Sequence, residues 1–331
     1  MTRDIVINGR FLSRCVTGVE RYGREIHSLI GNRCRVEMTR VNGLSGHAWE
    51  QFALPARLKP GSILWSPANT GPLMVRNQAL TIHDLSPLEH PEWFKKSFAL
   101  WYRQFLPKLA KRVPIVFTPS EYVREKVIKR FGAGNVIVTP NGVDTSRFHS
   151  SAVQCTYELP EKFIFFVGSL QPRKNLPALL KVWREIRDDY PEMWLLLAGK
   201  AGEIFGRMDV PTDQRVRFLS YVAEDDLAGL YAKAMLFVLP SFDEGFGLPA
   251  LEAMACGTPV IVSDGGALPE TIGNAGFIFK LSDSNGLSTA IRECLNNSGL
   301  RSSLIANGYE RIKDFSWRRS AELIWKTLNE I

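Results

Sequence analysis

Short apolar runs alternate with amphipathic stretches along all 331 residues of the chain. Runs of about four to six apolar residues without polar alternation are typical of strands in a parallel sheet covered on both faces. In the first half such runs predict strands at 4–8, 36–41, 62–65, 79–82, 115–118 and 136–139. Helical spacing of apolar residues predicts helices at 19–30, 92–112 and 120–131.

The same alternation resumes after a polar stretch at 141–162. Strands are expected at 163–167, 194–198, 216–219, 236–239 and 259–262, and helices at 176–189, 225–233 and 248–255. Strand–helix alternation on both sides of one linker predicts an α/β protein with two doubly wound, Rossmann-like domains facing a cleft. We expect the domains at 1–150 and 151–315, with a terminal helix at 316–331. Ligands of such sheets bind beyond the carboxyl ends of the strands.

Composition and charge exclude several classes of protein. Apolar residues make up 45% and charged residues 23%, which excludes a disordered chain or a coiled coil. The net charge of +7 is unevenly divided. Residues 1–151 hold 22 Lys and Arg against 11 Asp and Glu, a net +11, whereas residues 152–331 hold 19 against 23, a net −4. A basic half is suited to phosphates, anionic lipid or nucleic acid.

Cysteine usage and hydropathy bear on the compartment. The odd set Cys15, Cys34, Cys155, Cys256 and Cys294 contains no C-x-x-C pair, so we expect reduced thiols in a cytoplasmic protein. The N-terminus has no apolar run of signal-peptide length, and no stretch approaches the ~20 apolar residues of a membrane span. The sequence therefore predicts a soluble or peripheral protein.

One window combines two acidic residues with a glycine-rich turn. Glu244-Gly-Phe-Gly-Leu-Pro-Ala-Leu-Glu252 joins a predicted strand to a predicted helix. Gly245 and Gly247 let backbone N–H groups approach a ligand closely, and a helix start favours an anion. Glu252 lies in an otherwise apolar helix, where a carboxylate is costly unless a polar partner such as a sugar hydroxyl satisfies it. A surface helix with an exposed glutamate is the less favoured interpretation.

This window resembles the signature of the retaining glycosyltransferases of family four, which have the GT-B fold. The resemblance continues through Ala-Met-Ala-Cys-Gly-Thr-Pro-Val and covers nearly the whole chain. It implies that Glu244 and the turn residues Gly245, Phe246, Gly247 and Leu248 hold the donor sugar. It also implies that Glu252 binds the ribose hydroxyls of a nucleotide and that the terminal helix crosses back to the first domain.

A second segment, Gly168-Ser-Leu-Gln-Pro-Arg173-Lys174-Asn175, follows the first strand of the second domain. Adjacent cations at a strand end can hold a diphosphate through charge-assisted hydrogen bonds. The family has G-x-x-x-x-R-K-N here, so the resemblance gives Arg173 and Lys174 a catalytic role at the leaving diphosphate. It also places Gly168 and Asn175 at the donor. A solvated basic turn is the alternative.

Further donor contacts follow from the same resemblance. His83, in Thr-Ile-His-Asp at a strand end, corresponds to a family histidine that reaches the donor sugar or its backbone carbonyl, which implies a catalytic role beside Arg173, Lys174 and Glu244. A purely structural histidine is the alternative. Gly18 stands alone where the family commonly has two glycines. Ser120 is a good helix N-cap and in the family lies near the diphosphate. Tyr221 and Val222 are expected near the base, and Asn141 and Gly142 are expected to form a hinge turn.

The residues also bear on mechanism. No second carboxylate is placed to act as a nucleophile, as it would be in a retaining hydrolase. The resemblance implies a front-face displacement in which the leaving phosphate takes the acceptor's proton. The sequence has no D-x-D motif, so we expect that no metal and no other cofactor is required.

The predicted helix at 92–112 is basic and aromatic. Its aromatic residues repeat at near-helical spacing, with lysines and arginines between them. The residues expected to face a membrane or the acceptor are Lys95, Lys96, Trp101, Arg103 and Lys108. Three interpretations fit: a core helix with a solvated basic edge, a helix on an anionic membrane that also serves the acceptor, or a nucleic-acid surface. Core packing is favoured narrowly over membrane, and nucleic acid is least favoured.

The sequence thus predicts a cytoplasmic retaining glycosyltransferase, with peripheral binding to the inner face of the cytoplasmic membrane as an open alternative. The opening T-G-V-E-R-Y and the H-D-L-S run most resemble bacterial mannosyltransferases of O-antigen and exopolysaccharide assembly. This implies GDP-mannose as donor and a saccharide on a polyprenyl diphosphate as acceptor, with a UDP- or dTDP-sugar as the alternative donor. A sugar-nucleotide epimerase and a nucleic-acid-binding protein are remote alternatives.

Overall fold

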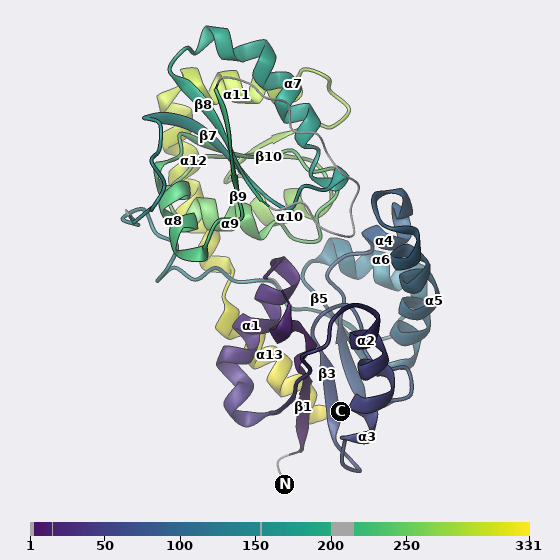
Figure 1. Ribbon diagram of the computed structural model, residues 1–331. Coiled ribbons are helices and arrows are strands. Elements are labelled where there is room, and N and C mark those ends of the chain that lie inside the picture. Colours follow the sequence, from purple (N-terminus) through teal and green to yellow (C-terminus); the bar gives the residue numbers. More distant parts are fainter. Residues whose placement is uncertain (1–2, 15, 153, 200–214) are drawn as a thin grey trace. The chain divides into compact units, whose positions relative to one another are not determined.

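The computed structural model describes residues 3–14, 16–152, 154–199 and 215–331. It divides into two compact units, each with its own sheet (Figure 1). The first unit comprises Met1–Pro91, Lys96–Gly142 and Ser316–Ile331, and the second comprises Glu92–Lys95 and Val143–Phe315. The division after Gly142 comes earlier than the predicted boundary at 150. Phe148 explains this difference, because its ring packs 6.1 Å from the ring of Tyr231 in the second unit.

The sheet of the first unit is parallel throughout. Its described strands are β1 (Ile5–Asn8), β2 (Arg35–Glu37), β3 (Ile63–Ser66), β4 (Gln78–Thr81), β5 (Ile115–Thr118) and β6 (Val136–Val138), in the order β2-β1-β3-β4-β5-β6. Every residue of β1, β3, β4 and β5 is buried, as expected for strands covered on both faces. β2 is shorter than predicted, since only Arg35–Glu37 pairs with β1.

Helices of the first unit cover this sheet. They are α1 (Gly18–Ile30), α2 (Gly43–Ala48), α3 (Leu54–Ala56), α4 (Ser86–Glu89), α5 (Lys96–Arg112), α6 (Glu121–Phe131) and α13 (Trp317–Glu330). α1 begins with a capping box in which the Thr17 backbone N–H donates to the Glu20 carboxylate at 3.3 Å. The C-terminal helix α13 packs against α1, with the rings of Trp317 and Tyr22 6.0 Å apart. The prediction that this helix returns to the first domain is confirmed.

The second unit repeats the design. Its strands are β7 (Lys162–Val167), β8 (Met193–Ala198), β9 (Val216–Ser220), β10 (Leu236–Leu239), β11 (Val260–Ser263) and β12 (Phe277–Phe279), all parallel, in the order β12-β11-β10-β7-β8-β9. The chain runs outward from β7 to β9 and then returns to place β10 beside β7. The strand order therefore reverses between β7 and β10, where doubly wound folds bind ligands.

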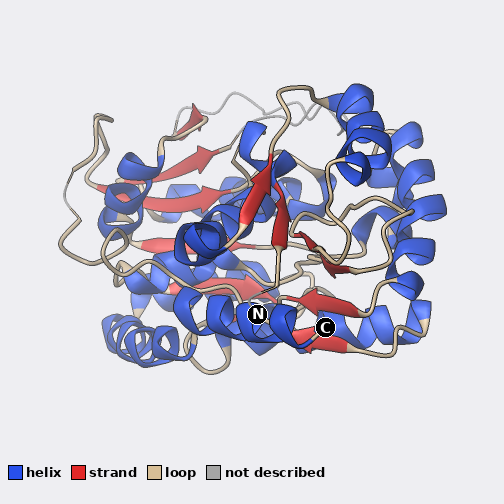
Figure 2. Ribbon diagram, turned by 90° about the horizontal axis from the view of Figure 1, so that it is seen from below, coloured by secondary structure: helices blue, strands red, loops and turns tan. Residues whose placement is uncertain are grey.

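The helices of the second unit are α7 (Leu176–Ile186), α8 (Glu224–Lys233), α9 (Leu248–Ala255), α10 (Leu268–Ile272), α11 (Gly286–Asn296) and α12 (Ser298–Arg311). A short 3₁₀ turn, Pro172–Lys174, precedes α7. Figure 2 shows helices along both sides of the red strands. The expected fold class, two doubly wound α/β domains, is confirmed.

Candidate active site

Glu244 is the centre of a buried charge cluster at the strand-order reversal of the second unit. Arg173 Nη1 donates to Glu244 Oε2 at 3.0 Å, and Lys174 Nζ donates to Oε1 at 2.5 Å. The Ser241 hydroxyl also donates to Oε1, at 2.7 Å. Arg173 and Lys174 follow β7, whereas Ser241 and Glu244 follow β10, so neighbouring strand ends bring the two sequence motifs together. Two cations thus meet on one carboxylate.

The surroundings of Glu244 fix its protonation state. Burial alone raises the pKa of this carboxyl, but Arg173, Lys174 and the Ser241 hydroxyl outweigh burial and lower the pKa to about 2. Glu244 is therefore ionised at neutral pH. Its oxygens accept hydrogen bonds and have no proton to donate.

A second loop holds the backbone of Glu244. The Ala267 N–H donates to the Glu244 carbonyl at 2.8 Å. Gly266 has φ +67°, and a Cβ there would lie 2.4 Å from both the N and the O of Glu244. Only glycine fits so close to this backbone. Ser241, Gly265 and Gly266 were not among the predicted site residues, although a Gly–Gly pair three residues after the predicted strand at 259–262 was a visible signal.

The segment after β7 is shaped to present its two cations. Asn175 takes the left-handed conformation with φ +52°, which ends the 3₁₀ turn and starts α7. A Cβ on Gly168 would lie 3.2 Å from Lys174 Cε, so this glycine leaves room for the lysine stem. The Phe242 N–H donates to the Arg173 carbonyl at 2.8 Å and ties the two loops together.

In the turn before α9, backbone groups rather than side chains are available to contact a ligand. Gly247 has φ +97° and caps the helix, while the side chains of Phe246 and Leu248 are buried. Gly245 precedes them in the same turn. Glu252 is 2% exposed within α9, and the Tyr231 hydroxyl donates to its Oε2 at 3.1 Å. A polar partner was expected for this buried carboxylate, and Tyr231 provides one that the sequence analysis had missed.

The remaining predicted donor residue pair follows β9. Tyr221 is 54% exposed and Val222 is buried, directly after Ser220, which has φ +56°. Their proposed contact with the base stays a prediction.

His83 lies at the end of β4 in the first unit, in a defined tautomer. Its Nε2 is 2.7 Å from the Pro67 carbonyl oxygen, which can only accept. Nε2 therefore carries the proton, and Nδ1 keeps its lone pair. Burial lowers the pKa of His83, against smaller opposing effects of Pro67, Asp84 and Glu20. The imidazole is thus neutral at neutral pH.

Three other predicted residues belong to the first unit. Gly18 is the first residue of α1, with open space where a Cβ would be. Ser120 caps α6 by accepting the Val123 N–H at 3.2 Å, which confirms the predicted cap. The Asn141 Oδ1 atom is buried and has no hydrogen-bond partner among the described residues. The roles of Gly18 and Ser120 at a donor stay predictions.

The burial of side chains along α5 distinguishes the interpretations of this basic, aromatic helix. Tyr102, Leu106 and Leu109 are buried in the core of the first unit. Trp101 is half-buried, stacked on Phe105 with centroids 3.6 Å apart and 4.6 Å from the His47 ring. Lys96, Arg103 and Lys108 are exposed on α5, and Lys95, which precedes the helix, is exposed as well. The aromatic residues thus favour the core-helix interpretation.

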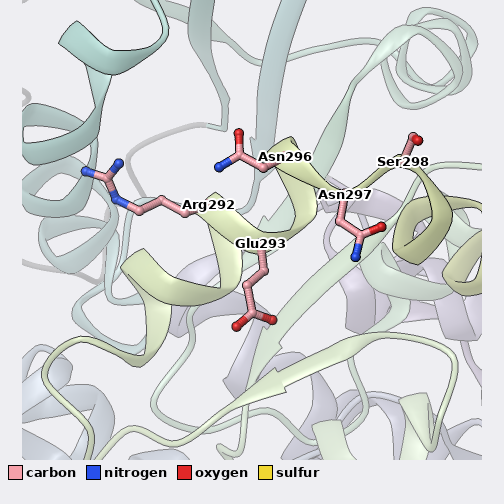
Figure 3. Close-up of a pocket in the computed structure, with 5 residues that line it drawn as sticks. All are labelled: Arg292, Glu293, Asn296, Asn297 and Ser298. Atoms are coloured by element: carbon pink, nitrogen blue, oxygen red, sulfur yellow. The ribbon is translucent and has the colours of Figure 1, made fainter.

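A pocket of about 520 Å³ lies elsewhere in the second unit. Figure 3 shows its lining residues, which are Arg292, Glu293, Asn296, Asn297 and Ser298 around the junction of α11 and α12. None of them belongs to the Glu244 cluster or to any predicted site, so this pocket plays no part in the assignment.

The described ranges bear on metal ligands, thiols and membrane spans. No group of three or more His, Cys, Asp or Glu side chains there is arranged to hold a metal ion. Cys34, Cys155, Cys256 and Cys294 are free thiols, and Cys15 lies outside the described residues. None of the helices in these ranges is both long and apolar enough to cross a bilayer.

Comparison with known proteins decides the family. The family described as Glycosyl transferases group 1 matches residues 156–311, and Glycosyltransferase Family 4 matches residues 62–147. The O-antigen chain mannosyltransferase B of Escherichia coli is 32% identical over 263 residues, covering 74% of this chain and 68% of that protein. The chain belongs to the group 1 glycosyl transferases. It is therefore a glycosyltransferase, as the sequence predicted.

Two further similarities extend this assignment. The O-antigen chain mannosyltransferase RfbU of Salmonella typhimurium is 31% identical to the transferase over 225 residues, covering 66% of this chain and 61% of that protein. The structure of Anabaena HepE in complex with UDP-glucose aligns with a TM-score of 0.78 at 18% identity, covering 100% of both chains. This likeness shows that the transferase has the same fold, the expected GT-B architecture.

Proposed function

We propose that the protein transfers mannose from GDP-mannose, with retention of configuration, to a saccharide on a polyprenyl diphosphate in bacterial surface polysaccharide synthesis. The observation that carries this proposal is the Glu244–Arg173–Lys174 cluster at the strand-order reversal. The names of the two O-antigen mannosyltransferase relatives support the choice of sugar and pathway.

Each group of the cluster has a chemical task. Arg173 and Lys174 hold the donor diphosphate, because their combined charge exceeds that of Glu244 and phosphate forms strong charge-assisted hydrogen bonds. The ionised Glu244 accepts hydrogen bonds from sugar hydroxyls near the start of α9. Glu252, which lies buried in α9 and accepts a hydrogen bond from Tyr231, binds the ribose hydroxyls. His83 offers Nδ1 to a hydroxyl of the donor sugar.

The reaction breaks the bond between the sugar C1 and the diphosphate oxygen and forms a bond between C1 and the acceptor oxygen. The acceptor's proton moves to the departing diphosphate. Glu244 is unsuited to act as a covalent nucleophile, since both of its oxygens are occupied by donors from Arg173, Lys174 and Ser241. The protein's contribution is then electrostatic, with Arg173 and Lys174 stabilising the negative charge that grows on the leaving group.

A UDP- or dTDP-sugar is the second candidate donor. HepE shares the fold and was solved with UDP-glucose, which keeps a uridine donor in consideration. Base recognition near Tyr221 and Val222 decides between the candidates, because the diphosphate contacts are common to all of them.

The reaction needs no metal ion in this proposal. Arg173 and Lys174 supply, beside the diphosphate, the positive charge that a divalent cation supplies in other transferases. Their placement 2.5–3.0 Å from Glu244 makes this charge a fixed part of the protein.

The first unit presents a surface suited to an anionic membrane that carries the acceptor. Met38, Val41 and Leu44 are 55%, 44% and 85% exposed around the start of α2. α2 lies beside the basic helix α5, since His47 contacts Trp101. Exposed apolar side chains next to exposed lysines and arginines favour a lipid surface at the inner face of the cytoplasmic membrane.

A transfer assay tests the proposed reaction. The protein is incubated with GDP-mannose, UDP-glucose or dTDP-rhamnose and a polyprenyl-diphosphate saccharide, with and without EDTA. We expect transfer from GDP-mannose alone, an α-linked product by NMR, and an unchanged rate in EDTA. Transfer from another donor would replace GDP-mannose, inversion at C1 would overturn the retaining mechanism, and loss of activity in EDTA would overturn the metal-free mechanism.

A further inference from the structure

His83 is held by two hydrogen bonds, one at its backbone and one at its ring. Its backbone N–H donates to the Asn69 side chain at 2.7 Å, and its Nε2–H donates to the Pro67 carbonyl at 2.7 Å. Both contacts come from the loop after β3. The terminal torsion of a histidine side chain is broad and roughly two-fold, so one ring hydrogen bond resists a ring flip only weakly. A flip would exchange the nitrogen positions for carbons and remove the acceptor Nδ1.

Tyr22 packs against the imidazole from α1. Its ring centroid is 4.8 Å from that of His83 and the two planes meet at 81°, an edge-to-face pair. Aromatic rings favour this geometry, so turning the imidazole would give up the edge-to-face contact with Tyr22. Tyr22 is itself fully buried, and its hydroxyl is 3.1 Å from the Thr139 hydroxyl.

Trp317 closes the arrangement from the C-terminal helix. Its ring lies 6.0 Å from that of Tyr22 at 65°, a second edge-to-face pair. The approach depends on Gly142, because a Cβ there would lie 2.1 Å from the Trp317 backbone nitrogen. The Ser320 hydroxyl donates to the Pro140 carbonyl at 2.6 Å. This bond fixes the first turn of α13 on the segment that follows β6 and contains Gly142.

We propose that Tyr22 and Trp317 are positioning residues that hold the His83 imidazole with Nδ1 available to the donor sugar. Neither needs to touch the substrate, since Trp317 supports the ring of Tyr22 and Tyr22 supports the ring of His83. The consequence for the reaction rests on the proposed role of His83, whereas the positioning itself does not. In this proposal the segment Pro140-Asn141-Gly142 and the start of α13 help to orient His83, in addition to connecting elements of the chain.

The test compares leucine and phenylalanine variants in the full-length protein. Tyr22→Leu and Trp317→Leu remove an aromatic ring, whereas Tyr22→Phe and Trp317→Phe keep one. Phe11→Leu is the matched control, because Phe11 is equally buried, packs against α1 at Gly23, and neighbours His27 rather than His83. ¹⁵N-histidine NMR without ligand reports the tautomer of His83, assigned by its loss in His83→Gln.

We expect a single Nε2–H tautomer in the native protein, in both phenylalanine variants and in Phe11→Leu. The two leucine variants should show a tautomer mixture and a kcat about 10-fold lower, with KM for the acceptor unchanged. Native tautomer signals and a kcat equal to that of Phe11→Leu would overturn the proposal. A shifted tautomer without any effect of His83→Gln on kcat would uphold the positioning and refute the role of His83 in transfer. Two independent leucine variants keep the test decisive if one fails to fold.

Discussion

Glu244 gathers its partners from two loops that the sequence places 70 residues apart. Its pKa of about 2 keeps it ionised wherever the enzyme works. Because this pKa is lowered on folding, the stability it contributes is present above pH 4.5 and is lost as the pH falls toward 2. Any loss of activity between pH 5 and 7 must therefore come from other groups.

His47 gives a sharper test of the charges in the first unit. Burial first, and then Arg10 and Arg14, lower its pKa to about 3. Below about pH 6.5 His47 is protonated in the unfolded chain but stays neutral in the folded protein. The free energy of unfolding therefore falls as the pH drops from 6.5 toward 3. His47→Gln should flatten this decline by up to about 1.4 kcal/mol per pH unit. Urea unfolding at several pH values measures it, and identical pH slopes in the two proteins would contradict the assignment.

Some residues of the candidate active site could be predicted from the sequence, and others could not. Arg173, Lys174 and Glu244 could be predicted because their motifs directly follow strands of a parallel sheet, whose carboxyl ends share one edge. Gly266 could not, because it acts through a close contact with the Glu244 backbone that forms only when the chain returns after β11. Ser241 stands only three residues before Glu244, but no motif marks its hydroxyl as a partner of that carboxylate. Tyr22 looked like an ordinary core aromatic, since no spacing rule relates it to His83.

Elements were predictable where their apolar pattern was regular. The buried strands β3, β4, β5, β10 and β11 appear near the predicted positions. The 43–56 region was missed because it is built from short turns of α-helix and π-helix around glycine and proline, without a sustained period. For α5 the period was correct but ambiguous, because apolar spacing alone does not distinguish a core-facing helix from one facing lipid.

The close approach of the Gly266 loop to Glu244 leads to a prediction at this scale. Gly266→Ala forces a Cβ against the Glu244 backbone, whereas Gly132→Ala, with a similar φ of +62°, meets nothing within 4 Å. The control should lose about 1–2 kcal/mol of unfolding free energy through backbone strain. Gly266→Ala should lose at least about 1 kcal/mol more, through overpacking, and most of its transferase activity. Equal losses in denaturant unfolding would show that the contact does not matter.

At the scale of the whole molecule, the net charge is distributed unevenly, and each half is suited to a different anionic partner. The second half carries −4 yet concentrates two cations at Glu244, which suits a nucleotide diphosphate. The first half carries +11, much of it on exposed side chains. Leu44 is the most exposed large apolar side chain in the described ranges, and with Met38 and Val41 it forms the surface near the start of α2 that we propose for the membrane.

Vesicle binding tests that surface. Leu44→Glu places a charge at the most exposed of these residues and should reduce sedimentation with phosphatidylglycerol vesicles about 10-fold. Ile128→Glu is the control, since Ile128 is a 40% exposed side chain on α6. Equal binding by both variants would exclude a lipid contact at α2.

The central claim is that Arg173 and Lys174 hold the diphosphate of the donor. Calorimetric titration of GDP and GMP into the native protein and Lys174→Met tests it most directly, with Lys181→Met, an exposed position on α7, as control. Loss of a charge-assisted bond should weaken GDP binding at least about 10-fold and GMP binding far less. The control should bind both nucleotides as the native protein does. Unchanged GDP affinity in Lys174→Met, or equal losses for GDP and GMP, would contradict the account.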